Sequence, residues 1–209
     1  MNKLSIGFVA LAAACTTALA DGTGTVHTNP FSFGNGGEFT VTQNTGYVGE
    51  TGMFSDFGGP GTFETFCVQL GEFFSPGATV YTMQISGATV AGGVPVDPRT
   101  AFLYTNFRNG NLAAYGFDYS PAGRQASAGL LQQAIWFAQG EGGSYNAFVF
   151  AAEVAIVNNL WSGVGDVRIL NMYNPDGSNA QDMLTIVPTP GAAALMGLGL
   201  LAAPRRRRA

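Results

Sequence analysis

Basic side chains, histidine and thiols are scarce in this 209-residue chain. It contains 9 lysine and arginine residues against 13 acidic ones, with one histidine and two cysteines. Residues 21–186 hold every acidic residue but only four arginines and no lysine, so their net charge is about −9. This balance argues against nucleic acid as a partner, because phosphate binding requires clustered Lys and Arg. An acidic surface of this kind is typical of an extracellular, solvated protein.

The usual catalytic constellations are also missing. His27 lies in a Gly- and Thr-rich stretch and is interpreted as a solvated loop residue, which leaves no scaffold-held base for a catalytic triad. No cluster has zinc-ligand spacing, and residues 174–179 around Gly177 lack the acidic density of a calcium loop. Glu64 and Glu72 could form a glycosidase pair, but they are interpreted as solvated strand residues. We therefore expect no enzyme, no metal and no cofactor.

Long hydrophobic runs are absent, and the N-terminal run is short. Lys3 precedes an apolar stretch over residues 4–14, and Ala18 and Ala20 fit a small-x-small cleavage site. The stretch has about half of the ~20 apolar residues that a membrane span requires. This order predicts a secretory signal peptide over residues 1–20, with lipoprotein processing at Cys15 as a minor alternative.

The C-terminal apolar run, residues 191–203, is also short. Thirteen residues of helix fall below the ~30 Å of a hydrocarbon core and allow only transient insertion into the inner membrane. The basic block that follows stays cytoplasmic by the positive-inside rule. The tail therefore has three parts, a Pro-containing motif (Val187, Pro188, Thr189, Pro190), the apolar run, and a basic end (Arg205, Arg206, Arg207, Arg208).

This tripartite tail, residues 187–209, resembles the PEP-CTERM sorting signal of bacterial surface proteins. Thr189 stands where that family's usual motif has Glu. The resemblance implies processing by an exosortase and a location at the cell surface, in the outer envelope or in the extracellular matrix. The protein would be membrane-associated before its C-terminus is processed.

Residues 21–186 form the exported body, which has the length of one domain. Alternating patterns predict strands over residues 38–43, 62–70 and 79–85. Start signals at Asp97-Pro98 and Ser120-Pro121 predict helices to about Gly110 and over 123–139, and an apolar stretch predicts a third over 144–161. Residues 167–173 and 183–187 flank a turn signal at 174–177 and predict a hairpin. We expect an α+β fold, a single β-rich domain (sandwich or barrel-like) with a central helical insertion of about three helices.

The second of these helices has an apolar face. Its helical spacing places Leu131, Ile135 and Ala138 together, and Leu130, Ala134 and Phe137 widen the face.

The body retains one cysteine, Cys67, after removal of the signal peptide. An unpaired cysteine in an exported protein has two ordinary explanations. It can be buried as a small hydrophobic residue, or it can form an intermolecular disulfide in an oxidising compartment.

A third explanation comes from the local sequences. Phe66-Cys67-Val68 and the run from Leu131 to Trp136 resemble the two motifs of thioester domains in bacterial surface adhesins. The resemblance implies that the Cys67 sulfur attacks the Gln132 carboxamide, with Gln133 as an alternative donor because it is adjacent. Leu131 replaces the family's Thr. The implied supporting wall of the pocket is Phe66, Ala134, Ile135 and Trp136.

The body further resembles one group of PEP-CTERM proteins, through residues 63–70, 104–110 and 131–136. The leading hypothesis is an exported surface or matrix protein that adheres covalently to an amine-bearing polymer through a Cys67–Gln132 thioester. The alternative is a non-covalent structural or glycan-binding surface domain with a buried free cysteine.

Overall fold

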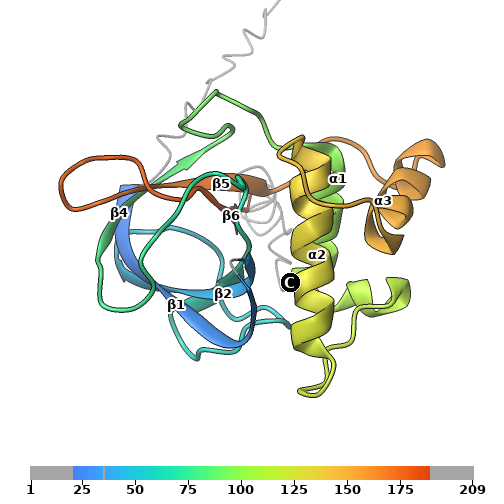
Figure 1. Ribbon diagram of the computed structural model, residues 1–209, viewed down its shortest axis with the longest axis horizontal. Helices are drawn as coiled ribbons and strands as arrows, with labels where there is room; N and C mark the ends of the chain where they lie inside the picture. Colours follow the sequence, from blue (N-terminus) through green and yellow to red (C-terminus); the bar gives the residue numbers. More distant parts are fainter. Residues whose placement is uncertain (1–20, 35, 189–209) are drawn as a thin grey trace, which may run out of the picture.

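The computed structural model describes residues 21–34 and 36–188 of the chain. A six-stranded antiparallel sheet curls into a nearly closed barrel, with strand order β3-β2-β1-β4-β5-β6. Three helices lie together on one side of it (Figure 1). The strands are β1 (Asp21–Phe33), β2 (Gly36–Thr45), β3 (Thr62–Thr65), β4 (Tyr81–Ser86), β5 (Val167–Tyr173) and β6 (Met183–Ile186). The helices are α1 (Pro98–Arg108), the short 3-10 helix η1 (Asn111–Tyr115), α2 (Arg124–Gln139) and α3 (Ala147–Val157).

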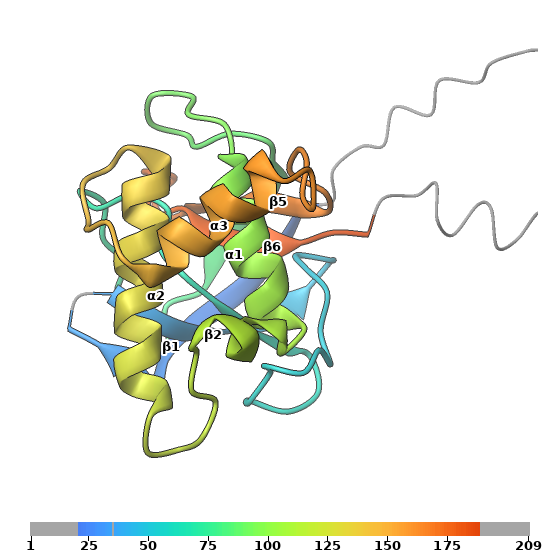
Figure 2. The same ribbon diagram turned by 90° about the vertical axis from the view of Figure 1, so that its right-hand side faces the viewer.

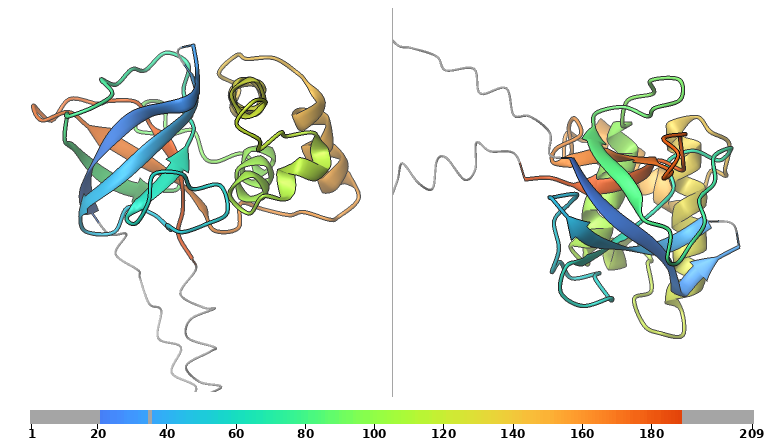
Figure 3. Two further views of the ribbon diagram at one scale, coloured as in Figure 1. Left: turned by 90° about the horizontal axis from the view of Figure 1, so that it is seen from below. Right: turned by 90° about the vertical axis from the view of Figure 1, so that its left-hand side faces the viewer.

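All helices lie between β4 and β5 in the sequence, which confirms the expected α+β domain with a central helical insertion. Viewed from below, the barrel and the helices form two adjacent layers (Figure 3). α2 runs along the barrel and contacts β1 and β2, and α1 lies beside α2 and contacts β5 of the barrel. α3 packs on α1 and α2 as the outer helix (Figure 2). One core fills the barrel and a second lies between the barrel and the helices.

Strand β1 was not predicted, and the interpretation of His27 as a loop residue is wrong. His27 pairs with Thr40 in the β1–β2 ladder, and its Nε2 lies 2.8 Å from the Thr25 hydroxyl. The local sequence carries little strand signal, because it is rich in glycine and contains Pro30. Gly24 is required where β1 passes between its neighbours, since a Cβ there would lie 2.7 Å from the Thr42 carbonyl oxygen.

The strand predicted over residues 62–70 is shorter than expected. β3 ends at Thr65, because from there the chain changes its partner from β2 to β6. Cys67 forms an antiparallel bridge with Met183, and Phe66 accepts a hydrogen bond from the Leu184 backbone at 3.1 Å. This segment, residues 66–68, joins the two edge strands and nearly closes the barrel. We call it the barrel seam.

The predicted helices and hairpin are confirmed with small changes in their ends. Asp97 caps α1, and its Oδ1 accepts from the Arg99 N–H at 2.8 Å. α3 is shorter than predicted because Asn146 caps it at the start and Asn158 ends it. The prediction of the apolar face of α2 is wrong for one residue, because Leu130 is exposed. Four other residues of the predicted face are buried as expected: Leu131, Ala134, Ile135 and Ala138.

Candidate functional site

The two residues of the implied thioester, 65 positions apart in the sequence, are in contact at the barrel seam. The Cys67 N–H donates to Gln132 Oε1 at 3.0 Å, and Gln132 Nε2 donates to the Cys67 carbonyl at 2.8 Å. The carboxamide therefore makes the two hydrogen bonds that the backbone of a neighbouring strand would make. It does so on one edge of Cys67, while Met183 of β6 lies along the other edge. Both side chains are buried, with 2% of Cys67 and 1% of Gln132 exposed. These bonds lock the Gln132 carboxamide carbon against the Cys67 backbone.

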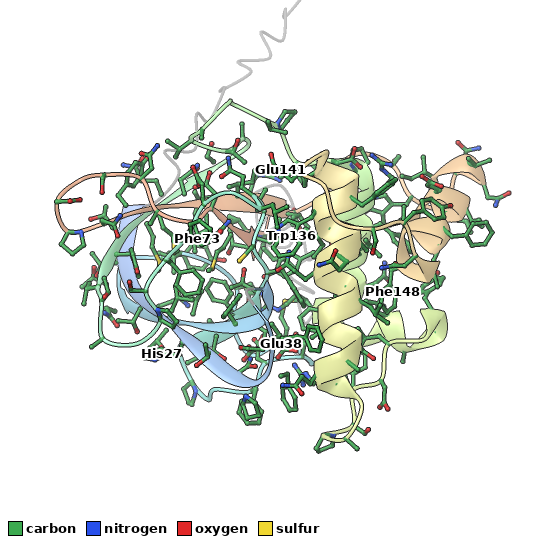
Figure 4. All side chains as sticks on the ribbon, viewed as in Figure 1. His27, Glu38, Phe73, Trp136, Glu141 and Phe148 are labelled. Carbon is green, nitrogen blue, oxygen red and sulfur yellow. The ribbon has the colours of Figure 1, made fainter. Side chains whose placement is uncertain are left out.

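The position of α2 explains why Gln132, and not Gln133, makes this contact. α2 buries two faces, one towards the other helices and one towards the barrel. Gln132 and Trp136 are four residues apart and share the barrel face, since residues at this spacing are neighbours on a helix. Gln133 lies one position around the helix and is only half-buried. Figure 4 shows Trp136 between α2 and the barrel.

The four residues expected to support the pocket divide between the two cores. Trp136 belongs with Cys67 to the core of the barrel, and its indole Nε1 is buried without a hydrogen-bond partner. Phe66, Ala134 and Ile135 belong to the core between the barrel and the helices. These three residues pack α2 against the barrel seam from the helical side, whereas Trp136 packs with Cys67 inside the barrel.

Gly36 at the start of β2 is a component of this site that the sequence did not reveal. A Cβ at this position would lie 2.6 Å from the Trp136 ring and 2.8 Å from Gln132 Cγ. Only a residue without a side chain lets β2 approach α2 so closely. Its signal in the sequence was weak, because 30 glycines are spread over the chain.

Substituting Gly36 by alanine is expected to destabilise the protein by about 1–3 kcal/mol, because the methyl group overpacks the contact with Trp136 and Gln132. Chemical denaturation followed by Trp fluorescence measures the change. Gly87→Ala is the matched control, since a Cβ there meets no atom within 4 Å and its φ is not left-handed. Equal stability of the two variants would show that Gly36 does not set the distance between β2 and α2.

A hollow of about 230 Å³ opens beside Cys67. It lies between the β1–β2 turn and the segment after the barrel seam, and Figure 4 shows Phe73 over this end of the barrel. Burial raises the pKa of the Cys67 thiol to about 12, so the free thiol is protonated at neutral pH. The lining residues are Thr28, Gly34, Phe39, Cys67, Glu72, Phe73, Phe74, Pro76 and Gln181.

A second polar cluster lies in the interior, and it corrects the interpretation of Glu64 as a solvated strand residue. Glu64 is fully buried and lies beside Glu38, which is also fully buried. Asn29 Nδ2 donates to both carboxyl groups, at 2.8 Å to Glu64 and 3.2 Å to Glu38. The Thr40 hydroxyl donates to Glu64 at 2.9 Å. Glu72, the proposed glycosidase partner, is half-buried in the hollow beside Cys67 and does not pair with Glu64.

Arg124 at the start of α2 supplies the cation for this cluster. Its Nε and one terminal nitrogen donate to the Glu38 carboxylate at 2.9 and 2.8 Å. Its guanidinium carbon lies 4.7 Å from the centroid of the Phe31 ring. Burial and the Glu38 charge raise the pKa of Glu64 to about 8, so the Glu38–Glu64 pair shares one proton at neutral pH. We call these five residues (Asn29, Glu38, Thr40, Glu64 and Arg124) the buried carboxylate cluster.

The remaining predicted features lie at the surface or outside the described residues. Residues 174–179 form the expected turn between β5 and β6, where Asp176 Oδ1 accepts from the Ser178 N–H at 3.0 Å. In the described part of the chain, no group of three or more His, Cys, Asp or Glu could hold a metal ion. No helix in residues 21–34 or 36–188 is long and apolar enough to cross a membrane.

Of the predicted sorting motif, Val187 and Pro188 follow β6 at the end of the described chain. Thr189, Pro190, residues 191–203 and Arg205 to Arg208 lie outside it, as does the predicted signal peptide over residues 1–20. Comparison of the chain with family models, curated proteins and solved structures gives no match.

Proposed function

We propose that this protein is exported to the cell surface or extracellular matrix, where it attaches covalently to an amine-bearing partner through a thioester between Cys67 and Gln132. The observation that carries the proposal is the paired hydrogen bond between the Gln132 carboxamide and the Cys67 backbone. These bonds keep the Gln132 carboxamide of α2 next to residue Cys67 of the barrel seam, which supports Gln132 as the acyl donor for the Cys67 thiol.

Formation of the thioester is an internal acyl transfer. The Cys67 sulfur attacks the Gln132 carboxamide carbon, a carbon–sulfur bond forms, and the carbon–nitrogen bond breaks. The amide nitrogen leaves as ammonia and takes the thiol proton with it. The product is an acyl group that remains electrophilic towards amines. An amine then forms an amide with the Gln132 carbon and releases the Cys67 thiol.

The surroundings of the pair favour survival of such a bond. Cys67 and Gln132 are almost completely shielded from solvent, and Trp136 with its 5% exposure covers the same side. Exclusion of water protects a reactive intermediate from hydrolysis. The exported body contains no lysine, so it offers no internal ε-amine to consume the thioester.

Export and sorting are the second part of the proposal. They rest on the sequence of the two ends, a signal peptide over residues 1–20 and the PEP-CTERM-like segment over residues 187–209. An exosortase is the expected processing partner. The short apolar run would hold the protein in the inner membrane only until that processing.

Intact mass spectrometry of the purified protein tests both parts. A thioester makes the chain lighter by one ammonia, and methylamine is expected to add to the native protein in one equivalent. Cys67→Ala and Gln132→Ala are each expected to restore the unmodified mass and to abolish the adduct. The same spectrum reports whether residues 1–20 and the segment containing Arg205 to Arg208 have been removed.

Gln133→Ala is the matched control, because Gln133 is half-buried and the hydrogen bonds to the Cys67 backbone come from Gln132. It should keep both the mass deficit and the methylamine adduct. An unmodified mass of the wild-type protein, together with a Cys67 that alkylates after unfolding, would falsify the thioester. Loss of the deficit in Gln133→Ala alone would assign the acyl donor to Gln133.

A non-covalent structural or glycan-binding domain is the second candidate, and one observation favours it. The Gln132 carboxamide already satisfies both backbone groups of Cys67, and burial raises the pKa of the thiol to about 12. In this role Gln132 stabilises the packing of α2 against the barrel, and no chemical reaction with Cys67 takes place. In that case the mass is unmodified, and Gln132→Ala costs stability because it leaves two buried backbone groups unpaired.

A further inference from the structure

The outer helix α3 has an apolar side that faces solvent. Its sequence is apolar on every side and contains one charged residue, Glu153. A helix of this composition is normally buried all round. In this fold one side of α3 packs on α1 and α2, whereas Phe150 on the other side is 59% exposed and Leu160, just after the helix, is 76% exposed. Exposed apolar surface of this extent is typical of a docking site.

A groove of about 450 Å³ follows the exposed side of α3. η1 forms its second wall, and both elements lie on the side of the helices away from the barrel (Figure 1). We call it the α3 groove (Tyr115, Phe150, Val154 and Leu160). None of its lining residues is charged, because Glu153 lies on the other flank of α3, 3.5 Å from Arg99. The groove therefore favours an uncharged, apolar occupant, since a charge buried in it would have no partner.

The C-terminal tail contains a segment of this chemistry. Residues 191–203 consist only of Gly, Ala, Leu and Met, without one charged or hydrogen-bonding side chain. As an α-helix they would be about 20 Å long, close to the length of about 16 Å for the 11 residues of α3. Leu195 and Leu198 are three residues apart and would share one side of that helix, so they can enter the groove together.

The tail also begins close to the groove. The Val187 N–H donates to the Asp166 carbonyl at 2.9 Å, which fixes the end of β6 to the connection between α3 and β5. Leu160 of the groove lies in the same connection, at most about 22 Å of extended chain before Asp166, and a turn at Val164 to Val167 shortens this path. The apolar run starts within about 14 Å of extended chain after Val187, so it can enter the groove at Leu160 and continue along α3.

The charges at the far end of α3 suit this direction. Phe117 lies against Phe148 near the start of α3, with 6.2 Å between ring centroids, and the exposed Asp118 follows it. A tail that runs from Leu160 towards the start of α3 brings the four arginines at residues 205–208 towards this acidic end. The body as a whole carries about −9, so its field attracts the basic block.

We infer that residues 191–203 pack as a helix in the α3 groove as long as the chain carries its C-terminal tail. The inference goes beyond the proposed function and needs neither the thioester nor an exosortase. Docking removes two apolar surfaces from water at once, which is favourable. It gives the short run an alternative to the membrane, where thirteen residues insert only transiently. Removal of the tail then exposes the groove, so that C-terminal processing would uncover an apolar binding surface.

Photochemical cross-linking of the chain 21–209 tests the contact in detergent-free buffer. p-Benzoylphenylalanine replaces Leu198, and peptide mapping by mass spectrometry identifies the residues that it joins after irradiation. We expect cross-links within one chain to η1 and to residues 147–160. Phe150→Ser should lower their yield about tenfold, because a buried phenylalanine contributes enough apolar contact for one such factor. Its side chain is exposed in the body, so the substitution leaves the fold intact.

Phe73→Ser is the matched control, since Phe73 is an equally exposed phenylalanine on the barrel and does not line the α3 groove. It should keep the wild-type yield. Cross-links that join two chains would assign the groove to a second copy and overturn the inference, as would a yield that Phe150→Ser does not change. Flotation of the chain 21–188 with phosphatidylcholine vesicles, together with an absence of cross-links to α3 in the chain 21–209, would assign the groove to a lipid surface instead.

Discussion

Replacing Arg124 by methionine is expected to lower the free energy of unfolding by about 3–5 kcal/mol, because it removes one partner of a buried ion pair. Arg124 is 8% exposed and is bound to the fully buried Glu38 through two charge-assisted hydrogen bonds. In the variant, the Glu38–Glu64 pair remains buried without a cation. Methionine fills much of the space beside the Phe31 ring, so the loss reports on charge rather than on an empty cavity.

Urea denaturation at pH 7 measures this change. Arg168→Met is the matched control, because the Arg168 side chain is only half-buried and donates to the nearby backbone carbonyls of Gly165 and Val167. We expect that control to change stability by less than about 1 kcal/mol. Adding Glu38→Gln to Arg124→Met should recover part of the loss, since it removes the uncompensated charge. A single variant as stable as wild type would show that the cluster does not depend on its cation.

The second large effect concerns Glu64 and pH. Its pKa is about 8 in the folded protein and close to 4.3 in an unfolded chain. Between these values the folded protein keeps a proton that the unfolded chain releases. The stability from this group is therefore full below about pH 4.3 and is lost as the pH rises towards 8, at no more than about 1.4 kcal/mol per pH unit.

Glu64→Gln is expected to remove this dependence, because an amide imitates the protonated acid at every pH. Its oxygen can accept from Asn29 and Thr40, and its NH₂ group can donate to Glu38, to which the Glu64 side chain is hydrogen-bonded. Near pH 5 the variant should match wild type within about 1 kcal/mol, whereas at pH 8.5 it should be more stable by about 2–4 kcal/mol. Denaturation curves at several pH values measure the difference.

Two other observations sharpen this experiment. Asp182 is buried and its pKa is raised to about 6, so a shallower slope of the same sign should persist below pH 6 in the variant. Glu153→Gln serves as the control, because the Glu153 carboxylate is 39% exposed and lies at the helical surface. Parallel pH profiles of wild type and Glu64→Gln would contradict the assignment of the shared proton to the Glu38–Glu64 pair.

The sequence was a reliable guide wherever the signal was local. Proline and an acidic or polar cap fixed the start of α1, and the turn signal at residues 174–177 fixed the β5–β6 hairpin. Hydrophobic periodicity predicted the buried side of α2 but included Leu130, which is exposed. The pattern could not reveal that α2 has a second buried face, because Gln132 on that face is polar and is satisfied by the backbone of a distant segment.

The sequence by itself determined an α+β domain with helices inserted between strands, and it singled out Cys67 and Gln132 as a pair. Only the tertiary structure decided that Gln132 contacts the Cys67 backbone, that β1 is a strand, and that Glu64 shares a buried cluster with Glu38 and Arg124. The reason is physical. Caps, turns and periodicity act within a few residues, whereas burial, pKa shifts and hydrogen bonds between residues 65 or 86 positions apart exist only once the barrel has nearly closed and α2 has packed against it.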